Sequence, residues 1–436
     1  MDDGDTAKEV HVETDDATIG DRWDDEELAL VSRVINSFCG YGVHHHRLIT
    51  DSRRRAFFAL PSRHQQILTG KPFNMLERFQ KIENAIDTNA DCARDIMRTG
   101  MQWTGLGRIL EAMDEASTSN PFVIDPQTGL PAVPGLESSP SFLDFSKASS
   151  TIRHLYREWS SEGARERSIC FDPLLQYLEN YYSGIPREKR HQIKILNPGS
   201  GLGRFVFDLG CLGFEAEGIE ISYHMVFGSM HLLNATQKAE QYRIYPFVLN
   251  GSNHLSEDNR LRQVMVPDIH PAAVQAAVSH LSEVPISQRL GISSGDFSVV
   301  FNTPENRGQY DVLATVFFLD TAKNPLAYME TAANCVKPGG LWMNLGPLKW
   351  HFENESDAAS SDGPAEKNIE QDRGIGNPGA VELVEADILQ LLSSFGFEII
   401  HYEDSSARAT GYIHDTKAME TNMFYASFWV ARRLDI

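Results

Sequence analysis

The residue types best suited to chemistry begin in a glycine-rich turn, the run Gly-Ser-Gly-Leu-Gly at 199–203, which follows an apolar stretch at 194–198. Glycines such as Gly199 and Gly201 let the backbone approach a ligand closely, and the helical pattern that follows offers unpaired N–H groups at its start. Glu220 stands about 20 residues further on, at the end of a second expected strand, where a carboxylate can accept hydrogen bonds from both hydroxyls of an adenosine ribose. The turn and this carboxylate predict an adenosine-containing cofactor.

A second carboxylate, Asp320, ends the nearly continuous apolar run 310–320. Such a run is typical of a strand buried on both faces of a parallel sheet. Ligands of open α/β sheets bind where strands end, so Asp320 is a candidate for the reaction site. The other interpretation is a helix N-cap, because Asp before Thr-Ala-Lys-Asn caps a helix well. His351 follows the next expected strand, and on residue type alone it is more often structural than a ligand.

The position after the glycine turn discriminates between cofactors. A dinucleotide site prefers glycine or alanine at the sixth position of G-x-G-x-x-G, and here that position is Arg204. The turn instead resembles motif I of class I methyltransferases, whose cofactor is S-adenosyl-L-methionine. The Lys-Pro-Gly-Gly turn at 337–340, before the expected strand 341–345, is a further resemblance to that class. Both features argue against an NAD-linked oxidoreductase.

Composition limits the partners. The formal net charge of −21 disfavours nucleic acid and anionic membrane surfaces, and no apolar run reaches the roughly 18 residues of a membrane span. The five cysteines lie far apart without a C-x-x-C pair, which indicates buried thiols in a reducing compartment, the cytoplasm or the nucleus. The triplet His44-His45-His46 has no partner at metal-ligand spacing, so we expect a solvated bend and no metal.

The alternation of strand and helix patterns predicts an α/β fold, a class I methyltransferase-like Rossmann sheet with a helical N-terminal region. Residues 1–25 are expected to be a disordered acidic tail, and residues 26–148 a helical region with a linker. Residues 149–436 are expected to form the methyltransferase domain. Within that domain, 238–290 is interpreted as an insertion and 354–379 as a flexible acidic loop.

Two further sets of residues fit a cofactor role in this fold. The amphipathic helix expected at 149–159 precedes the core, and such helices commonly cap the cofactor; Arg157 would meet the methionine carboxylate, with His154 beside it. An outward-facing arginine explains the pattern equally well. After the third strand, Asp296 is placed to hold the adenine amino group and Phe297 to pack on the ring.

Several long motifs make the resemblance specific. They are P-G-S-G-L-G-R (198–204), P-D-I-H-P (267–271), G-D-F (295–297), F-F-L-D-T-A-K-N (317–324), K-P-G-G-L-W-M-N-L-G-P-L-K-W-H-F-E-N (337–354), R-H-L-Y-R-E-W-S (153–160) and V-I-N-S-F-x-x-Y-G (34–42). From about residue 26 onward the chain is similar to the carnosine N-methyltransferase family. The resemblance implies methylation of the imidazole of carnosine, β-alanyl-histidine, at the ring nitrogen nearer the side-chain attachment, which gives anserine.

The resemblance also implies site residues. The expected cofactor-binding residues are His154, Arg157, Gly199, Gly201, Glu220, Asp296, Phe297 and Val316. The expected catalytic residues are Asp320 and His351, and the expected substrate-binding residues are Asp320, His351, Tyr412, Phe424 and Tyr425. Two positions depart from the family pattern: His154 stands where the family more often has Gln, and one tyrosine remains in the stretch 422–425, where the family has a cluster. The second departure concerns substrate identity more than reaction type.

The chemistry expected of Asp320 follows from the imidazole ring. A neutral imidazole carries a free lone pair on one nitrogen only, and with a pKa near 6.5 it is mostly neutral at pH 7. By accepting the N–H of the far nitrogen, Asp320 would leave the near nitrogen free and stabilise the imidazolium that forms. His351 would hold the carboxylate or amide of the substrate.

Two other functions are compatible with the sequence. One is methylation of a histidine in a peptide or protein by the same fold, and the other is a non-catalytic scaffold whose N-terminal helices bind a partner. A small imidazole dipeptide is the expected substrate, and a homodimer through the N-terminal helices is the expected assembly.

Overall fold

The computed structural model describes residues 24–115, 121–136, 138–353, 374 and 379–435. The chain divides into two compact units, each made of separate stretches of sequence. The helical unit comprises the chain up to Ala164 together with Tyr223–Ala272 and Ile413–Thr421, and the sheet unit comprises Arg165–Ser222, Ala273–Tyr412 and the chain from Asn422 onward. The domain expected over 149–436 contains residues of both units. The expected domain boundaries stay a prediction.

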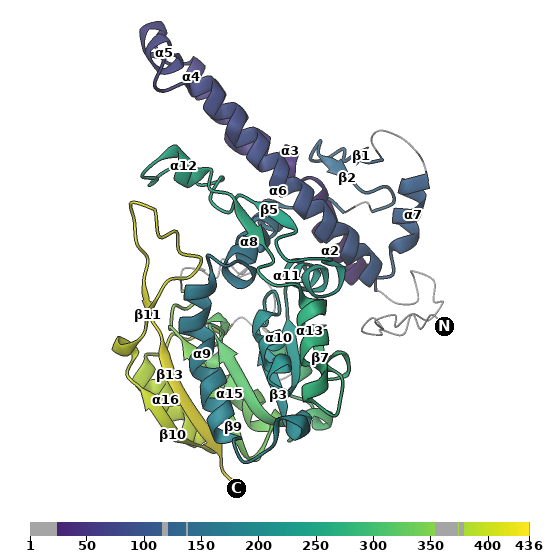
Figure 1. Ribbon diagram of the computed structural model, residues 1–436, viewed down its shortest axis with the longest axis vertical. Helices are drawn as coiled ribbons and strands as arrows, with labels where there is room; N and C mark the ends of the chain where they lie inside the picture. The colour runs from purple at the N-terminus through teal and green to yellow at the C-terminus, as the bar shows by residue number, and fades with distance from the viewer. Residues whose placement is uncertain (1–23, 116–120, 137, 354–373, 375–378, 436) are drawn as a thin grey trace, which may run out of the picture. The chain divides into compact units, whose positions relative to one another are not determined.

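The sheet unit is built on seven strands in the order β10-β13-β9-β8-β3-β4-β7 (Figure 1). Strands β7, β4, β3, β8 and β9 run parallel to their neighbours, whereas β13 is antiparallel to both β9 and β10. This mixed order confirms the expected class I methyltransferase fold. The bounds are β3 Lys194–Pro198, β4 Glu215–Glu220, β7 Leu290–Ser294, β8 Tyr310–Val316, β9 Val336–Gly346, β10 Phe397–Glu403 and β13 Ser427–Arg433.

The strand order fixes where a ligand can bind. From β3 the chain proceeds outward to β4 and β7, and then returns to place β8 on the other side of β3. In open α/β sheets, ligands bind outside the carboxyl ends of the strands at such a reversal. The glycine turn follows β3 and Asp320 follows β8, so the topology brings the two predicted sites to neighbouring strand ends.

Alternation along the strands builds a core on each face of the sheet. On one face, Ile195 packs with residues of helices α9 (Ala164–Tyr181) and α10 (Arg204–Cys211). On the other face, Leu196 packs with residues of α14 (Phe297–Val300), α15 (Pro325–Cys335) and α16 (Glu385–Ser394). Because both faces are covered, β8 is apolar over most of its length, in agreement with the nearly continuous apolar run in the sequence.

The helical unit is organised around α6 (Met75–Trp103), the longest helix drawn in Figure 1. A Cβ atom added at Gly100 of α6 would lie 2.2 Å from the ring of Phe227 on α11, so the small residue is what allows the two helices to approach so closely. The other helices of the unit are α2 Asp25–Cys39, α3 Tyr41–His45, α4 Ser52–Phe58, α5 Ser62–Thr69, α7 Gly107–Glu115, α8 Phe142–Trp159, α11 Tyr223–Met230 and α12 Glu257–Arg260, with π-helical turns η1 His46–Asp51 and η3 His231–Ala235.

Short elements complete the two units. The helical unit contains the strand pairs β1 Val123–Ile124 with β2 Pro131–Ala132 and β5 Tyr242–Ile244 with β6 Val264–Val266. The first pair lies in the stretch expected to be a linker. The remaining elements are η2 Arg187–Gln192, α13 Pro271–Val278, η4 Ser279–Leu281, η5 Ile286–Gln288, η6 Pro304–Asn306, η7 Leu319–Thr321, η8 Ser405–Ala407, β11 Ala409–Thr410 and β12 Phe424–Tyr425.

Three expected boundaries differ from the structure. The helix expected from residue 149 begins at Phe142, because Ser141 and Asp144 form a capping box there. The apolar strand expected to reach 320 ends at Val316, where the backbone turns. The last expected strand, 424–430, is two strands separated by Ala426, since β12 pairs with β11 and β13 pairs with β9 and β10.

Two predicted segments fall mainly on residues that the structure does not describe. Of the expected acidic tail, only Asp24 and Asp25 are described; Asp24 caps α2, and Asp25 is its first residue. Of the expected acidic loop at 354–379, only Gly374 and Gly379 lie within the described residues. Among the helices that the structure describes, none has both the length and the apolar character needed to cross a bilayer.

Candidate functional site

The glycine turn after β3 has the backbone geometry that its sequence predicted. Gly199, Gly201 and Gly203 adopt φ angles of +65°, +56° and +77°, in the left-handed region that favours glycine. A Cβ atom at Gly199 would also lie 2.5 Å from the Phe318 ring, so the position excludes a side chain on two grounds. Gly203 is the N-cap of α10, whose first N–H groups therefore follow the turn directly.

Glu220 is the last residue of β4, and its carboxylate hydrogen-bonds to the glycine turn. Its Oε2 accepts the Gly201 N–H at 3.0 Å, and its Oε1 accepts the Ser222 N–H at 2.9 Å, while the residue is 8% exposed. Glu220 thus stands at the end of β4 beside the glycine turn, the position predicted for the residue that binds the ribose hydroxyls, and that role stays a prediction.

Asp296 and Phe297 begin the short helix α14. Asp296 is its N-cap and accepts the Ser298 N–H at 2.8 Å and the Ser298 hydroxyl at 2.7 Å. Phe297 is 4% exposed and meets Phe318 edge to face, with ring centroids 5.7 Å apart. Phe318 in turn stacks on Tyr328 at 4.7 Å. The aromatic cluster formed by Phe297, Phe318 and Tyr328 thus adjoins the glycine turn through the contact of Phe318 with Gly199.

Asp320 lies in η7, immediately after β8, and is 3% exposed. Its Oδ2 accepts the Lys349 N–H at 3.0 Å, and its backbone carbonyl accepts the His351 N–H at 3.1 Å. Its Oδ1 is buried and has no hydrogen-bond partner among the described residues. Burial raises the pKa of Asp320 to about 6, although the Lys349 N–H and the Lys349 charge oppose the shift.

The alternative interpretation of Asp320 as a helix N-cap does not hold in the structure. The N-cap of α15 is Asn324, whose side chain accepts the Leu326 N–H at 3.1 Å. The Asp320 side chain is instead directed to the backbone of the segment after β9. A buried carboxylate that does not cap a helix and keeps an unused acceptor atom is costly to maintain, which favours a role in binding or catalysis.

An aromatic group surrounds Phe317, the residue that turns the chain away from β8. Phe317 has φ +52°, a strained value for a bulky side chain, and such strain clusters at functional sites. Its ring lies 5.3 Å from that of Tyr412 and 6.2 Å from that of Phe424, and the Lys349 ammonium lies 6.0 Å from the Phe424 ring. Two of the predicted substrate residues are therefore brought together here.

The remaining substrate candidates are placed less directly. Tyr425 is 61% exposed and follows Phe424 in β12, so the two side chains point to opposite faces of the strand. His351 lies in a turn, tied by its backbone to Asp320, and its side chain is exposed. Desolvation and the neighbouring Lys349 charge nevertheless lower the pKa of His351 from its ordinary value.

The predicted cofactor residues belong to both units. Val316 is the last residue of β8 and pairs with Leu345 of β9. His154 and Arg157 lie on α8 of the helical unit, where His154 Nδ1 is 3.2 Å from the Glu158 carboxylate and Arg157 is 5% exposed. The burial of Arg157 contradicts the interpretation of an outward-facing, solvent-exposed arginine. The cofactor role of His154 and Arg157 stays a prediction.

The histidine triplet takes a form that the sequence did not predict. His44 stacks on Phe145 at 3.9 Å, His45 is buried with Nε2 2.7 Å from the Ser149 hydroxyl, and His46 pairs with Asp87 at 2.7 Å. The triplet is thus helical and packed, not a solvated bend. In the part of the chain that the structure describes, no group of three or more His, Cys, Asp or Glu side chains is arranged to hold a metal ion.

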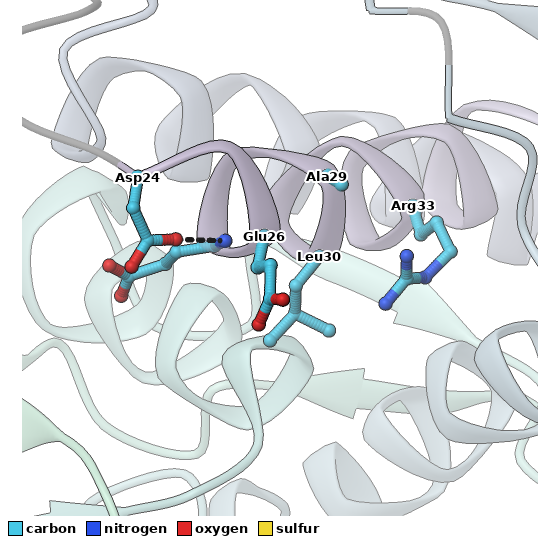
Figure 2. A pocket seen from close by; sticks show the side chains of 6 residues that line it. Asp24, Glu26, Ala29, Leu30 and Arg33 are labelled. Carbon is cyan, nitrogen blue, oxygen red and sulfur yellow. Dashed lines mark hydrogen bonds between the residues drawn. The ribbon is translucent and has the colours of Figure 1, made fainter.

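A pocket beside α2 lies apart in sequence from every predicted site residue (Figure 2). In Figure 2 the Asp24 carboxylate accepts the Glu27 N–H, the N-cap bond of the helix. The lining residues are Asp24, Glu26, Glu27, Ala29, Leu30 and Arg33. All come from a single helix, so this pocket offers no convergent set of chemical groups.

Sequence reasoning missed Phe317 and Lys349. Phe317 was interpreted as part of a straight strand, and nothing in its residue type signals a left-handed backbone. Lys349 acts through its backbone N–H on Asp320, which no side-chain pattern encodes. Its place between the strand 341–345 and His351 was the only available signal.

Comparison with known proteins agrees with this geometry. The model of the carnosine N-methyltransferase family matches residues 134–435. A carnosine N-methyltransferase of Schizosaccharomyces pombe is 29% identical over 94% of this chain and 97% of its own length. A carnosine N-methyltransferase of Drosophila melanogaster is 30% identical over 95% of this chain and 81% of its own.

A solved structure of a SAM dependent methyltransferase from Aquifex aeolicus covers 66% of this chain and 98% of its own, with 13% identity and a TM-score of 0.33. That likeness is too low to carry an argument, so the fold rests on the strand order. The family match covers well over half of the chain, and the Drosophila relative is matched along most of its length. The chain therefore belongs to the carnosine N-methyltransferase family, whose members are enzymes that use S-adenosyl-L-methionine as methyl donor.

Proposed function

We propose that the protein methylates the imidazole ring of carnosine at the nitrogen nearer the side-chain attachment, giving anserine. The observation that carries the proposal is Asp320: a carboxylate at the end of β8, buried, fixed through Oδ2, and with Oδ1 available to accept a hydrogen bond. An imidazole N–H is a donor of the right kind for that atom.

Asp320 would select the reactive form of the substrate. If its Oδ1 accepts the N–H of the far ring nitrogen, the near nitrogen keeps its lone pair and faces the methyl donor. The carboxylate also stabilises the positive charge that the ring gains on methylation, as a carboxylate does behind a catalytic histidine. With a pKa of about 6, Asp320 is ionised at pH 7, as this role requires.

The aromatic group around Phe317 supports a cationic product. Aromatic faces attract a cation within about 6 Å, as the Lys349 ammonium at 6.0 Å from the Phe424 ring illustrates, and Tyr412 and Phe424 both lie beside Phe317. We propose Tyr412 and Phe424 as substrate-binding residues. The exposure of Tyr425 makes it the weakest member of the predicted set. His351, tied to Asp320 by its backbone, is proposed to bind the carboxylate or amide of the dipeptide.

The glycine turn and Glu220 are proposed to hold the cofactor, with the turn approaching its chain and Glu220 accepting the ribose hydroxyls. S-adenosyl-L-methionine supplies the methyl group from its sulfonium. Asp296 and Phe297 are proposed to bind the adenine. Val316, the last residue of β8, is proposed to contact the cofactor at the carboxyl end of that strand. His154 and Arg157 are proposed to contact the methionine portion, because a buried guanidinium is suited to a carboxylate.

The deciding experiment is methyl transfer from labelled S-adenosyl-L-methionine to a panel of imidazole compounds. The panel contains carnosine, free histidine, the α-linked dipeptide alanyl-histidine, and longer histidine peptides. We expect carnosine to give the highest kcat/KM and the product to carry its methyl group on the nearer nitrogen. Preference for the longer peptides would favour the alternative of a peptide or protein histidine, and absence of turnover with all of them would favour a scaffold.

We also propose a homodimer formed through the N-terminal helices. Large apolar side chains are exposed at the connected ends of α4, α5 and α6, including Phe58 at 56%, Ile67 at 52% and Leu76 at 46%. Exposed patches of this kind mark interaction surfaces. Light scattering should give twice the chain mass, and Ile67→Asp should give the monomer mass.

The proposed location is cytoplasm or nucleus, which microscopy of the tagged full chain tests.

A further inference from the structure

The segment Ile413–Thr421 belongs to the helical unit, whereas the residues on either side of it belong to the sheet unit. Tyr412 precedes the segment directly, and Phe424 follows it within three residues. Both aromatic side chains contact Phe317. The conformation of this segment therefore constrains, through the covalent chain, the two residues proposed to contact the substrate ring.

The segment is held along part of its length by the loop that precedes α12. The Met419 N–H donates to the Asn253 carbonyl at 2.7 Å, and His254 and Ala418 form a β-bridge. The Asn253 side chain also contacts Glu420. The stretch expected to be an insertion thus has a structural task in the helical unit, because part of it binds a segment from near the C-terminus.

Asp415 is the centre of this attachment. Its Oδ1 lies 3.3 Å from the Arg262 guanidinium and accepts the Lys417 N–H at 3.0 Å, and its Oδ2 accepts the Asn259 amide at 3.0 Å. The Arg262 and Asp415 side chains are only 9% and 8% exposed. The residues converging on Asp415 come from α12, from the residues just after it, and from the segment itself.

Arg262 is fixed by further contacts of its own. Its guanidinium lies 4.8 Å from the Phe247 ring centroid and 5.9 Å from that of Tyr156, and its Nε lies 3.2 Å from Glu162. The Tyr156 hydroxyl also donates to the His414 carbonyl at 3.3 Å. Arginine suits such a site because its planar group binds carboxylates and stacks on rings at the same time.

The segment needs this attachment because its first residue is strained. Ile413 has φ +53°, a left-handed value that a β-branched residue rarely adopts, and it is buried. A conformation of this kind persists only where the surrounding structure over-determines it. Buried ion pairs contribute little net stability but can impose one conformation over its alternatives.

We propose that Arg262 and Asp415 are positioning residues for the substrate, which hold the segment 413–421 so that Tyr412 and Phe424 keep their places beside Phe317. The inference rests on the proposed function, since it concerns the same site. It gives these two residues, neither of which is among the expected site residues, a part in substrate affinity but none in cofactor affinity or in the chemical step.

The test compares Arg262→Gln with Arg54→Gln. Arg54 is the matched control, because it also forms an ion pair in the helical unit, with Glu83 at 2.8 Å, but has no contact with the segment. We expect Arg262→Gln to raise the KM for carnosine about tenfold or more, with kcat within about threefold and the dissociation constant of S-adenosyl-L-methionine unchanged. A rise in KM with unchanged kcat shows the loss of an interaction that stabilises the bound substrate and the transition state equally. Arg54→Gln should leave the KM within about twofold.

A conservative variant keeps the test decisive if Arg262→Gln does not fold. Arg262→Lys retains the charge but loses the planar group, so we expect a smaller rise in KM, about threefold, in a folded protein. Equal KM values in the Arg262 variants and the control, or a parallel loss of cofactor affinity, would overturn the inference. An inactive wild type would instead overturn the proposed function, so the two failures are distinguishable.

Discussion

Glu220 and Asp320 are both buried carboxylates at the carboxyl ends of strands, yet their surroundings differ. Glu220 is 8% exposed, and each of its oxygens accepts a backbone N–H of the chain around the glycine turn. Asp320 is 3% exposed, and only one of its oxygens has a hydrogen-bond partner among the described residues. The first carboxylate completes a local structure, whereas the second is kept buried at a cost.

The different surroundings of the two carboxylates suit them to different roles. A carboxylate that accepts a backbone N–H through each of its oxygens is held in one orientation. A carboxylate whose charge is opposed by burial has a pKa of about 6 and gains from a donor that approaches it. Glu220 is thus suited to binding and Asp320 to the reacting ring.

The largest effect expected from this contrast is on turnover. Asp320→Asn replaces the charged acceptor by an amide, which cannot stabilise an imidazolium, so we expect kcat to fall about 10³- to 10⁴-fold. The affinity for S-adenosyl-L-methionine should remain near that of the wild type. Labelled methyl transfer and calorimetry measure the two quantities, and loss of cofactor binding in this variant would abolish the distinction between the carboxylates.

Lowering the pH should reduce activity through protonation of Asp320. Protonation of Asp320 near pH 6 removes the acceptor, and protonation of an imidazole near pH 6.5 removes the nucleophile. Both changes occur as the pH falls, so kcat/KM for carnosine should drop by about two orders of magnitude between about pH 7.5 and 5. The slope of log kcat/KM against pH should exceed one at the acid end. A slope of one would mean that the substrate alone titrates.

Substitution of Glu220 should lower the affinity for S-adenosyl-L-methionine. If Glu220 accepts the ribose hydroxyls as proposed, Glu220→Gln removes the charge from those hydrogen bonds, and charge-assisted bonds contribute about 1.5–3 kcal/mol. We expect the dissociation constant of S-adenosyl-L-methionine to rise about 10- to 100-fold. Glu215→Gln on the same strand is the control, since Glu215 forms a half-exposed pair with Lys194. Equal effects of the two variants would remove Glu220 from the cofactor site.

The smallest effect expected is on stability, and its sign separates the two carboxylates. The pKa of Asp320 is raised on folding from 3.8 to about 6, so its stability cost grows as the pH rises through this window and is complete above it. Asp320→Asn should therefore increase the free energy of unfolding at pH 8 by about 1–2 kcal/mol. Glu220→Gln should decrease it, because the Gly201 and Ser222 N–H groups lose a charged acceptor. Chemical denaturation of both variants checks the signs.

The sequence predicted the parts of the site whose chemistry is local. A glycine turn with left-handed backbone, an acidic residue at the end of the next strand, and a carboxylate after an apolar strand are all set by neighbouring residues. The alternation of strand and helix patterns predicted the α/β class, and the structure supplies the strand order. The interpretation of Asp320 as a cap could be tested only when the structure placed Asn324 at the start of α15.

The sequence did not predict what depends on tertiary contacts. Phe317 takes a left-handed conformation because the chain must leave β8 there, and Lys349 reaches Asp320 through its backbone. Helix α11, which lies within the expected methyltransferase domain 149–436, belongs to the helical unit, where Phe227 packs on Gly100 of α6. Periodicity shows that a face is buried but not which partner covers it.

The division of the chain into two interleaved units has a consequence for biosynthesis. The chain passes between the units after residues 164, 222, 272, 412 and 421. The helical unit obtains its last piece only with residues 413–421, and the sheet obtains its antiparallel strand β13 only after that. On a ribosome that delivers the chain from the N-terminus, the helical unit is whole only after residue 421 and the sheet only after β13, so the two units complete their folding nearly together.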